Sequence, residues 1–195
     1  MLMSPSIEFY FDYASPWAFL ANALLERRFD GVPITYTPIY LRGLESFATG
    51  LPYTADKLRY VAQDVARVAR HENVEMKAPS NFPINGLYAL RGAMVAQAAG
   101  NFAAYHQAMF NAAWREDRDV SKKDVVIEIA KSLSIPDFET KIDEPNLKES
   151  LKKETERAVQ RGLFGVPTFF VGEKLFWGQD RMDYARREFE RAQQK

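Results

Sequence analysis

The stretch IEFYFDYASPWAFLANALL, which runs from Ile7 to Leu25, decides the fold because a strand-forming pattern and a helix-forming pattern meet within it. Its first residues, IEFYF, are mostly β-branched or aromatic and favour a strand. After Ser15 the apolar residues recur three and four positions apart, which is the spacing of a helix. A serine cap followed by proline at the first helical position, here Pro16, is a common start of a helix. We therefore predict a strand that leads directly into a helix at Ser15.

The predicted helix start at Ser15 also indicates a chemistry. The first backbone N–H groups of a helix have no partner within it, and the helix dipole favours an anion. A thiolate, a carboxylate or a phosphate is therefore the group best placed there. Two interpretations stay open from these residues alone: Ser15 only caps the helix, or its hydroxyl also contacts such a group on a ligand.

Later segments complete a sheet that is interrupted by helices. Residues 32–40 read as a second strand, so the first helix connects two parallel strands. About a hundred residues with helical patterns follow. A strand that opens with Pro167 and a second strand ending at Trp177 then form a hairpin, and residues 180–193 form the last helix. This order predicts an α/β protein with a thioredoxin-like fold (βαβ…αββα), interrupted by a large all-helical insertion.

The predicted domains follow from this order. We place the thioredoxin-like domain at residues 1–40 and 145–195, and the helical insertion domain at residues 41–144. Within the insertion, Thr54 caps a predicted helix. The apolar stripe of that helix comprises Leu58, Val61, Ala62, Val65, Val68 and Ala69. Ser121, with an aspartate three residues later, predicts the start of another helix.

Lys57, Tyr60 and Asp64 recur along a face that neighbours the apolar stripe of the helix capped by Thr54. Two interpretations of this polar face stay open. It is either a solvated flank, as surface charges usually are, or a polar rim over a pocket.

The composition is that of a compact globular protein. Its 195 residues, 47% of them hydrophobic, suffice for one large domain or two small intertwined domains. The formal net charge is +0, so electrostatics give no argument for nucleic acid or an anionic membrane as a partner. We find neither a signal peptide nor an apolar run long enough to cross a membrane, and expect a cytoplasmic protein. His71 and His106 lie far apart without a carboxylate pattern, so we expect no metal site.

The tetrapeptide Ser15–Ala18, SPWA, follows an aromatic-rich strand, an aspartate and two further residues. This order resembles the start of thioredoxin-fold proteins of the DsbA kind, where the tetrapeptide is Cys-Pro-x-Cys. The chain contains no cysteine, so any thiol that reacts there must come from a ligand. The segment GVPT around Pro167 resembles the strand start of those proteins that opens with a cis-proline. The resemblance implies that the peptide groups of Val166 pair with a peptide ligand whose thiol reaches Ser15.

A more specific resemblance covers nearly the whole chain. Its motifs are FDYASPWAFLA, Lys57 with Tyr60 and Asp64, NFPIN with Leu87 and Ala89–Arg91, the segment Trp114–Ser121, and RGLFGVPTFFVGEKLFWGQDR. They resemble the 2-hydroxychromene-2-carboxylate isomerase family, which is related to kappa-class glutathione transferases. The resemblance implies glutathione as cofactor and a homodimer. It also implies a glutathione site, which comprises Ser15, Trp17, Val166, Pro167, Trp177, Gly178, Gln179 and Asp180.

Physical chemistry supports these roles. A carboxylate such as that of Asp180 can accept from the ammonium group of the γ-glutamyl end, and Gln179 can donate to its carboxylate. The resemblance makes Ser15 the catalytic residue, which holds glutathione as a thiolate. The implied reaction interconverts 2-hydroxychromene-2-carboxylate and trans-o-hydroxybenzylidenepyruvate in aromatic hydrocarbon degradation, through reversible addition of the thiolate. The substrate is then a small aromatic carboxylate, and its candidate binding residues are Arg42, Lys57, Tyr60 and Asn85.

One segment departs from the family pattern. Relatives commonly carry asparagines in the loop before the Lys57 helix, whereas this chain has Phe47 and Leu51. Both replacements are apolar, which predicts a drier pocket and leaves another electrophile possible. Two alternatives therefore stay open beside the isomerase. One is a glutathione transferase or peroxidase that consumes glutathione, and the other is a redox-inert binding module with a thioredoxin fold.

Overall fold

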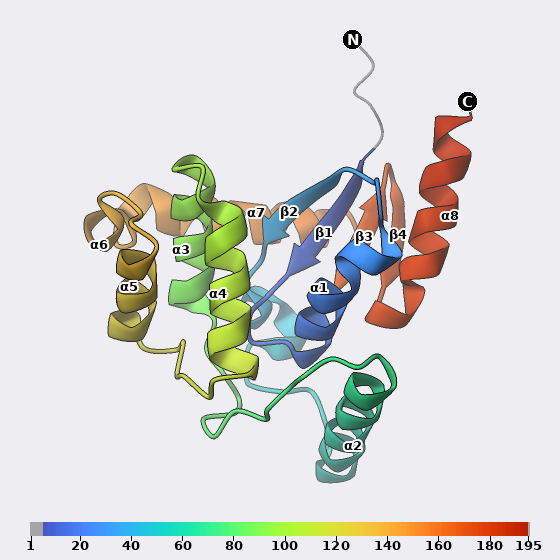
Figure 1. The fold of residues 1–195 in the computed structure, drawn as a ribbon, viewed down its shortest axis with the longest axis horizontal. Helices are drawn as coiled ribbons and strands as arrows, with labels where there is room; N and C mark the ends of the chain where they lie inside the picture. The colour runs from blue at the N-terminus through green and yellow to red at the C-terminus, as the bar shows by residue number, and fades with distance from the viewer. Residues whose placement is uncertain (1–5, 195) are drawn as a thin grey trace.

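The computed structural model describes residues 6–194. Its first unit is the predicted βαβ arrangement of β1 (Ile7–Phe11), α1 (Pro16–Arg28) and β2 (Ile34–Pro38). The two strands pair in parallel, with Ile7 opposite Ile34. A parallel pair needs a crossover connection, and α1 supplies it on one face of the sheet (Figure 1).

The hairpin near the end of the chain completes the sheet. β3 (Thr168–Val171) pairs antiparallel with β1, and β4 (Lys174–Trp177) pairs antiparallel with β3. The strand order is β2-β1-β3-β4, so the predicted thioredoxin-like fold is confirmed. A single 3₁₀ turn, η3 (Gln179–Arg181), precedes α8 (Met182–Gln193), so the last α-helix begins two residues later than predicted.

Helices fill the chain between β2 and β3. The short 3₁₀ turns η1 (Leu41–Gly43) and η2 (Glu45–Phe47) come first. The helices that follow are α2 (Ala55–His71), α3 (Leu87–Ala98), α4 (Phe102–Trp114), α5 (Lys123–Ser132), α6 (Phe138–Lys141) and α7 (Pro145–Gln160). In Figure 1, α3 to α6 stand beside the sheet and α2 projects from the body. The domain boundaries at residues 40 and 145 stay a prediction, because buried side chains of both parts form one continuous cluster.

Aromatic rings build the centre of this cluster. Phe9 of β1 stacks on Phe169 of β3 with ring centroids 5.2 Å apart. Phe11 meets the His106 ring of α4 edge-on at 4.5 Å. Both phenylalanines of β1 are fully buried, one toward β3 and the other toward the helices of the insertion. Such pairs add about 0.5–1.5 kcal/mol beyond the burial of their area. β1 therefore packs against both β3 and α4. These contacts fix the position of its C-terminal end, which leads to Ser15.

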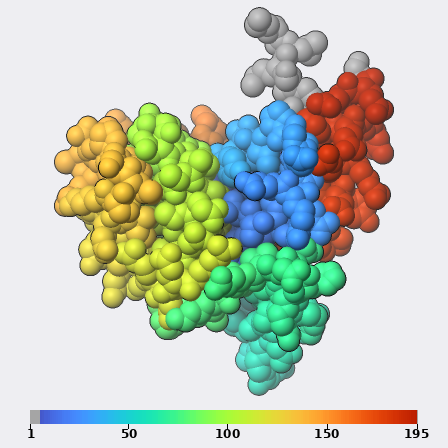
Figure 2. Space-filling model, in the orientation of Figure 1, coloured from blue at the N-terminus to red at the C-terminus, as the bar shows by residue number. Residues whose placement is uncertain are grey.

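The apolar stripe of α2 is buried only toward its C-terminal end. Val65 and Ala69 are buried, whereas Leu58 is half-buried and Ala62 is exposed. The first half of the stripe is therefore less buried than the second, although Val61 still packs against the core. Figure 2 shows this region standing out from the rest of the surface.

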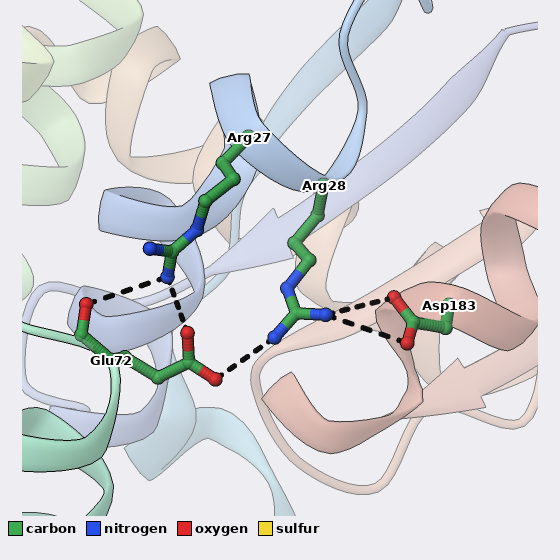
Figure 3. A network of polar contacts seen from close by, with 4 residues as sticks. All are labelled: Arg27, Arg28, Glu72 and Asp183. Carbon is green, nitrogen blue, oxygen red and sulfur yellow. Dashed lines mark hydrogen bonds and ion pairs between the residues drawn. The ribbon is translucent and has the colours of Figure 1, made fainter.

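A charged network fastens the C-terminal end of α2. Glu72, which follows the helix, accepts hydrogen bonds from Arg27 and Arg28 of α1. Arg28 also contacts Asp183 of α8, with Nη1 3.2 Å from Oδ1 (Figure 3). The end of α2 is thus tied to α1, whose N-terminus carries Ser15.

Ser121 does not start a helix, contrary to prediction. α5 begins at Lys123, and the Ser121 hydroxyl instead accepts the backbone N–H of Asn85 at 2.9 Å. Its side chain therefore holds the loop before α3. Within residues 6–194, no helix is both long enough and apolar enough to span a membrane.

Candidate functional site

Ser15 lies at the join between β1 and α1 and is 5% exposed. Its Oγ accepts the backbone N–H of Ala18 at 3.2 Å, as an N-cap does. The same hydroxyl donates to the carbonyl oxygen of Val166 over 3.4 Å, which is long for a hydrogen bond of this type. The hydroxyl therefore spans the start of α1 and the segment before β3, and its proton is held weakly.

The peptide bond between Val166 and Pro167 is cis, as predicted. The ladder between β1 and β3 starts at Thr168, so the peptide groups of Val166 lie beyond its first pair. The carbonyl oxygen of Pro167 accepts the backbone N–H of Gly178 at 2.9 Å. This bond brings the cis-proline segment and the end of β4 together, on the side where Ser15 approaches Val166.

The segment from Trp177 to Asp180, which is predicted to bind the γ-glutamyl end of glutathione, is therefore adjacent to the cis-proline. Trp177 is 48% exposed, and its ring lies 5.0 Å from that of Phe164. Gly178 has a φ of 108°, which a residue with a side chain rarely adopts. Gln179 is half-buried in η3, and Asp180 is exposed with its carboxylate 3.3 Å from Arg181. A polar ligand can reach the side chains of both Gln179 and Asp180.

Trp17 occupies the first turn of α1 and is half-buried. Pro16 has no N–H, and Ser15 uses that of Ala18. The Trp17 N–H is consequently the group in this turn that can face a ligand. The structure thus gathers all eight residues predicted to bind glutathione into two neighbouring segments and one helix start.

A small pocket of about 50 Å³ adjoins the loop that carries Ser15. Its polar residues are Asp12, Tyr40 and Arg42. The apolar residues Phe47 and Leu51 also line it, so the departure from the family pattern lies at this pocket. Ligand pockets usually measure roughly 300–1,000 Å³, so this pocket is smaller than most.

A larger open depression of about 460 Å³ lies at the other end of α1, where Phe29 and Gly31 line it together with Tyr36 of β2. It carries the side chains of Glu26 and Asp30 but no residue of the Ser15 loop. The 13 residues of α1 separate it from Ser15 by about 20 Å. We therefore place the candidate site at the smaller pocket, next to Ser15.

Of the residues predicted to contact substrate, only Arg42 lines this pocket. Its guanidinium has no hydrogen bond or ion pair with any residue from 6 to 194. Asn85 is one residue away from the lining, and its Oδ1 accepts from the hydroxyl of Tyr40 at 3.1 Å and from the N–H of Leu87 at 3.2 Å. Asn85 therefore positions Tyr40, which does line the pocket.

Lys57 and Tyr60 lie on the projecting half of α2 and do not line the pocket. The ammonium group of Lys57 stands 4.7 Å above the ring of Tyr53, and Tyr60 is 59% exposed. The periodic pattern placed these two residues on one helix face correctly. It did not determine what that face would meet.

Asp12 is the residue that sequence reasoning missed. It is 1% exposed and lines the pocket. Its carboxylate accepts the N–H of Ala14 at Oδ1 and that of Leu41 at Oδ2, each over 2.9 Å. Burial raises the pKa of this carboxyl to about 6, although both hydrogen bonds and the charge of Arg42 oppose the rise. Its position three residues before Ser15 was the one available signal.

His106 is a buried structural histidine. Its Nδ1 lies 3.0 Å from the hydroxyl of Tyr13 and its Nε2 lies 2.9 Å from Oδ1 of Asn22. Burial lowers its pKa to about 3, so the ring is neutral and one nitrogen donates while the other accepts. Within the described part of the chain, no group of three or more histidine, aspartate and glutamate side chains is arranged to hold a metal ion.

Comparisons with known proteins agree with this architecture. The family model of the DSBA-like thioredoxin domain matches residues 6–190. A 2-hydroxychromene-2-carboxylate isomerase from Pseudomonas putida is 29% identical over 184 residues, which cover 90% of each chain. The solved structure of a 2-hydroxychromene-2-carboxylate isomerase superposes with a TM-score of 0.81 at 29% identity, covering 95% of both chains. A probable DsbA oxidoreductase from Streptomyces coelicolor shares the fold, with a TM-score of 0.78, 16% identity and coverage of 98% of this chain and 91% of its own.

Proposed function

This chain belongs to the family of DSBA-like thioredoxin domains, and from that premise we propose that it is a glutathione-dependent isomerase. The proposed reaction interconverts 2-hydroxychromene-2-carboxylate and trans-o-hydroxybenzylidenepyruvate. One observation carries the proposal: a serine hydroxyl occupies the helix start opposite a cis-proline, in a chain without cysteine. The similarity to named isomerases over 90% of the chain supports an enzyme of this class.

The residues around Ser15 fit a thiolate. The N–H of Trp17 and the positive end of the α1 dipole favour an anion there. The Ser15 proton, held at 3.4 Å by Val166, can turn toward a sulfur at little cost. Such surroundings lower the pKa of a thiol from about 8.5 by a unit or more, and each unit corresponds to about 1.4 kcal/mol.

The remainder of glutathione fits the neighbouring segments. Glutathione is a peptide, and the groups of Val166 beyond the β3 ladder can pair with its backbone. Gln179 can donate to the carboxylate of the γ-glutamyl end. The Asp180 carboxylate can accept from its ammonium group, in exchange for the exposed contact with Arg181, which contributes little.

The pocket beside Ser15 fits a small aromatic acid. Arg42 offers a carboxylate a guanidinium that has no ion pair with any residue from 6 to 194, and Phe47 and Leu51 offer apolar contact for a ring. Tyr40, whose hydroxyl donates to Asn85, lines the same space. Bound at Ser15, glutathione supplies a thiolate that adds reversibly to the conjugated chain, which allows rotation about the former double bond, and it is released unchanged.

Lys57 and Tyr60 join the site in this proposal when the first half of α2 moves toward the pocket. That half buries little surface, and the charged network at Glu72 fastens only the other end of the helix. The pocket must also open to admit an aromatic acid, because it measures only about 50 Å³. We further propose a cytoplasmic homodimer that acts in the catabolism of aromatic compounds.

The test is the interconversion of the two isomers, followed by absorbance, with and without glutathione. We expect a rate that requires glutathione, leaves its concentration unchanged and is lost in Ser15→Ala. Steady consumption of glutathione would instead identify a transferase or peroxidase. A chain that neither catalyses the reaction nor gains thermal stability from glutathione would be a binding module of another kind. A ligand at about a hundred times its dissociation constant adds about 2.7 kcal/mol to the free energy of unfolding.

A further inference from the structure

Asp12 joins the segments that enclose the pocket. Its side-chain oxygens bind two different segments, the Ser15 loop through the Ala14 N–H and the start of the insertion through the Leu41 N–H. Its own carbonyl oxygen accepts the N–H of Ser15 at 3.1 Å. One residue thus contacts both the loop that presents Ser15 and the turn that carries Arg42.

A third segment closes against the same carboxylate. A Cβ atom added at Gly86 would lie 2.3 Å from Oδ1 of Asp12, so the backbone of Gly86 approaches it as closely as a residue without a side chain permits. The neighbouring Asn85 is fixed by Tyr40 and by Ser121. The Asp12 carboxylate is therefore enclosed by three stretches of backbone, all of which line the pocket.

The charge of Asp12 is not neutralised by an ion pair with any residue from 6 to 194. The charged or titratable side chains that face it are Arg42 from η1, Tyr40 directly before η1, and its chain neighbour Tyr13. Gly86, which precedes α3, adds no charged or titratable side chain. The two backbone N–H groups are its direct partners. Because a protonated carboxyl uses one oxygen to hold a proton, proton uptake weakens one of these two bonds.

We propose that Asp12 is a positioning residue of the active site, whose carboxylate form fastens the Ser15 loop to the Arg42 turn and so sets the distance between the thiol-binding end and the carboxylate-binding end. This inference rests on the proposed function. Asp12 is not placed to transfer a proton to substrate, because both oxygens are used by backbone donors. It acts through the spacing of Ser15 and Arg42.

The charge on Asp12 should therefore control turnover. Displacing a reacting group by about 1 Å commonly costs about a hundredfold in rate, so we expect Asp12→Asn to lower kcat by roughly 10–100-fold. Glutathione affinity should change less than threefold or so, because six of its eight predicted contacts, from Val166 to Asp180, lie on segments that Asp12 does not bind. Asparagine keeps the size of the side chain but presents an amide donor to one of the two N–H groups.

The experiment has one readout that needs no substrate. Amide resonances of Ala14 and Leu41 are followed in the free wild-type protein from about pH 5 to about pH 8. Both should titrate together with a midpoint near 6, as the Asp12 carboxyl should, and both should stop titrating in Asp12→Asn. Glu149→Gln, which removes an exposed carboxylate from α7, is the matched control and should leave both titrations in place.

The second readout is the pH profile of kcat with saturating glutathione. Two groups must be ionised in the wild type, the thiol and Asp12, so log kcat should fall with a slope approaching about 2 below pH 6. In Asp12→Asn the slope should be about 1, because only the thiol remains. An unchanged slope in Asp12→Asn, or amides whose titration midpoint lies near 4, would overturn the proposal. Amides that titrate near 6 in a protein without isomerase activity would support the contacts proposed for Asp12 and refute the proposed reaction instead.

Discussion

Ser15 has two roles in this account, and one set of substitutions separates them. As an N-cap its Oγ accepts the Ala18 N–H at 3.2 Å, and loss of such a cap costs about 0.5–2 kcal/mol. For a domain of this size that corresponds to a fall in Tm of roughly 1–8 °C. As a hydrogen-bond donor to the thiolate, the same hydroxyl lowers the pKa of the glutathione thiol by at least about one unit. Its loss should therefore reduce the rate at neutral pH about tenfold or more.

Thr54→Ala is the matched control for Ser15→Ala. Thr54 caps α2 by accepting the Lys57 N–H at 3.3 Å, and this cap lies outside the pocket. Differential scanning fluorimetry should show a loss of Tm in both variants, whereas the thiol pKa of bound glutathione should rise only in Ser15→Ala. If Ser15→Ala lost stability but kept the wild-type rate, Ser15 would be a helix cap and nothing more.

Four further predictions concern packing, charge and pH. Gly86→Ala should destabilise the fold by about 1–3 kcal/mol in denaturant titrations, because its Cβ would lie 2.3 Å from Asp12, whereas Gly43→Ala, with its nearest atom at 3.4 Å, should cost less than about 1 kcal/mol. Glu72→Gln should lower the free energy of unfolding by no more than about 1 kcal/mol, since its arginine partners are partly exposed, while hydrogen exchange in α2 should quicken. Leu51→Asn should alter the KM for the aromatic acid more than it alters the glutathione affinity measured by calorimetry. The reason is that Leu51 lines the pocket and is not one of the predicted glutathione residues. The pKa of Asp12 is about 6 in the folded state, above its unfolded value. The folded state therefore gains stability from the protonated carboxyl at low pH and loses that gain as the pH rises through 6. Between about pH 4 and pH 8, urea titrations should show wild type losing up to about 3 kcal/mol of unfolding free energy relative to Asp12→Asn.

Local patterns were sufficient to predict the strand, the helix start at Ser15 and the terminal hairpin. Each depends on propensity and spacing within about twenty residues, which a sequence displays directly. The cis bond before Pro167 was expected from resemblance to a family, since a proline alone permits either isomer.

Contacts between distant segments were not predictable in the same way. Helical periodicity placed Lys57 and Tyr60 on one face, but it did not show that the first half of α2 lies away from the pocket. Ser121 carries an ordinary capping signal, yet its hydroxyl binds the backbone of Asn85, 36 residues away. The role of Asp12 could not be predicted from the residues around it, because Leu41 and Gly86, which it contacts, come from later segments. Such long-range pairings override local preference.

The central claim is that Ser15 holds glutathione as a thiolate, and the most direct test is the pKa of bound glutathione. Thiolate absorbance in the ultraviolet, measured by difference between the complex and its components across pH, reports this value. We expect a thiol pKa at least about one unit below 8.5 in the wild-type complex, and a return toward 8.5 in Ser15→Ala. A bound thiol that titrates near 8.5 in the wild type, or a lowered value that persists in Ser15→Ala, would contradict it.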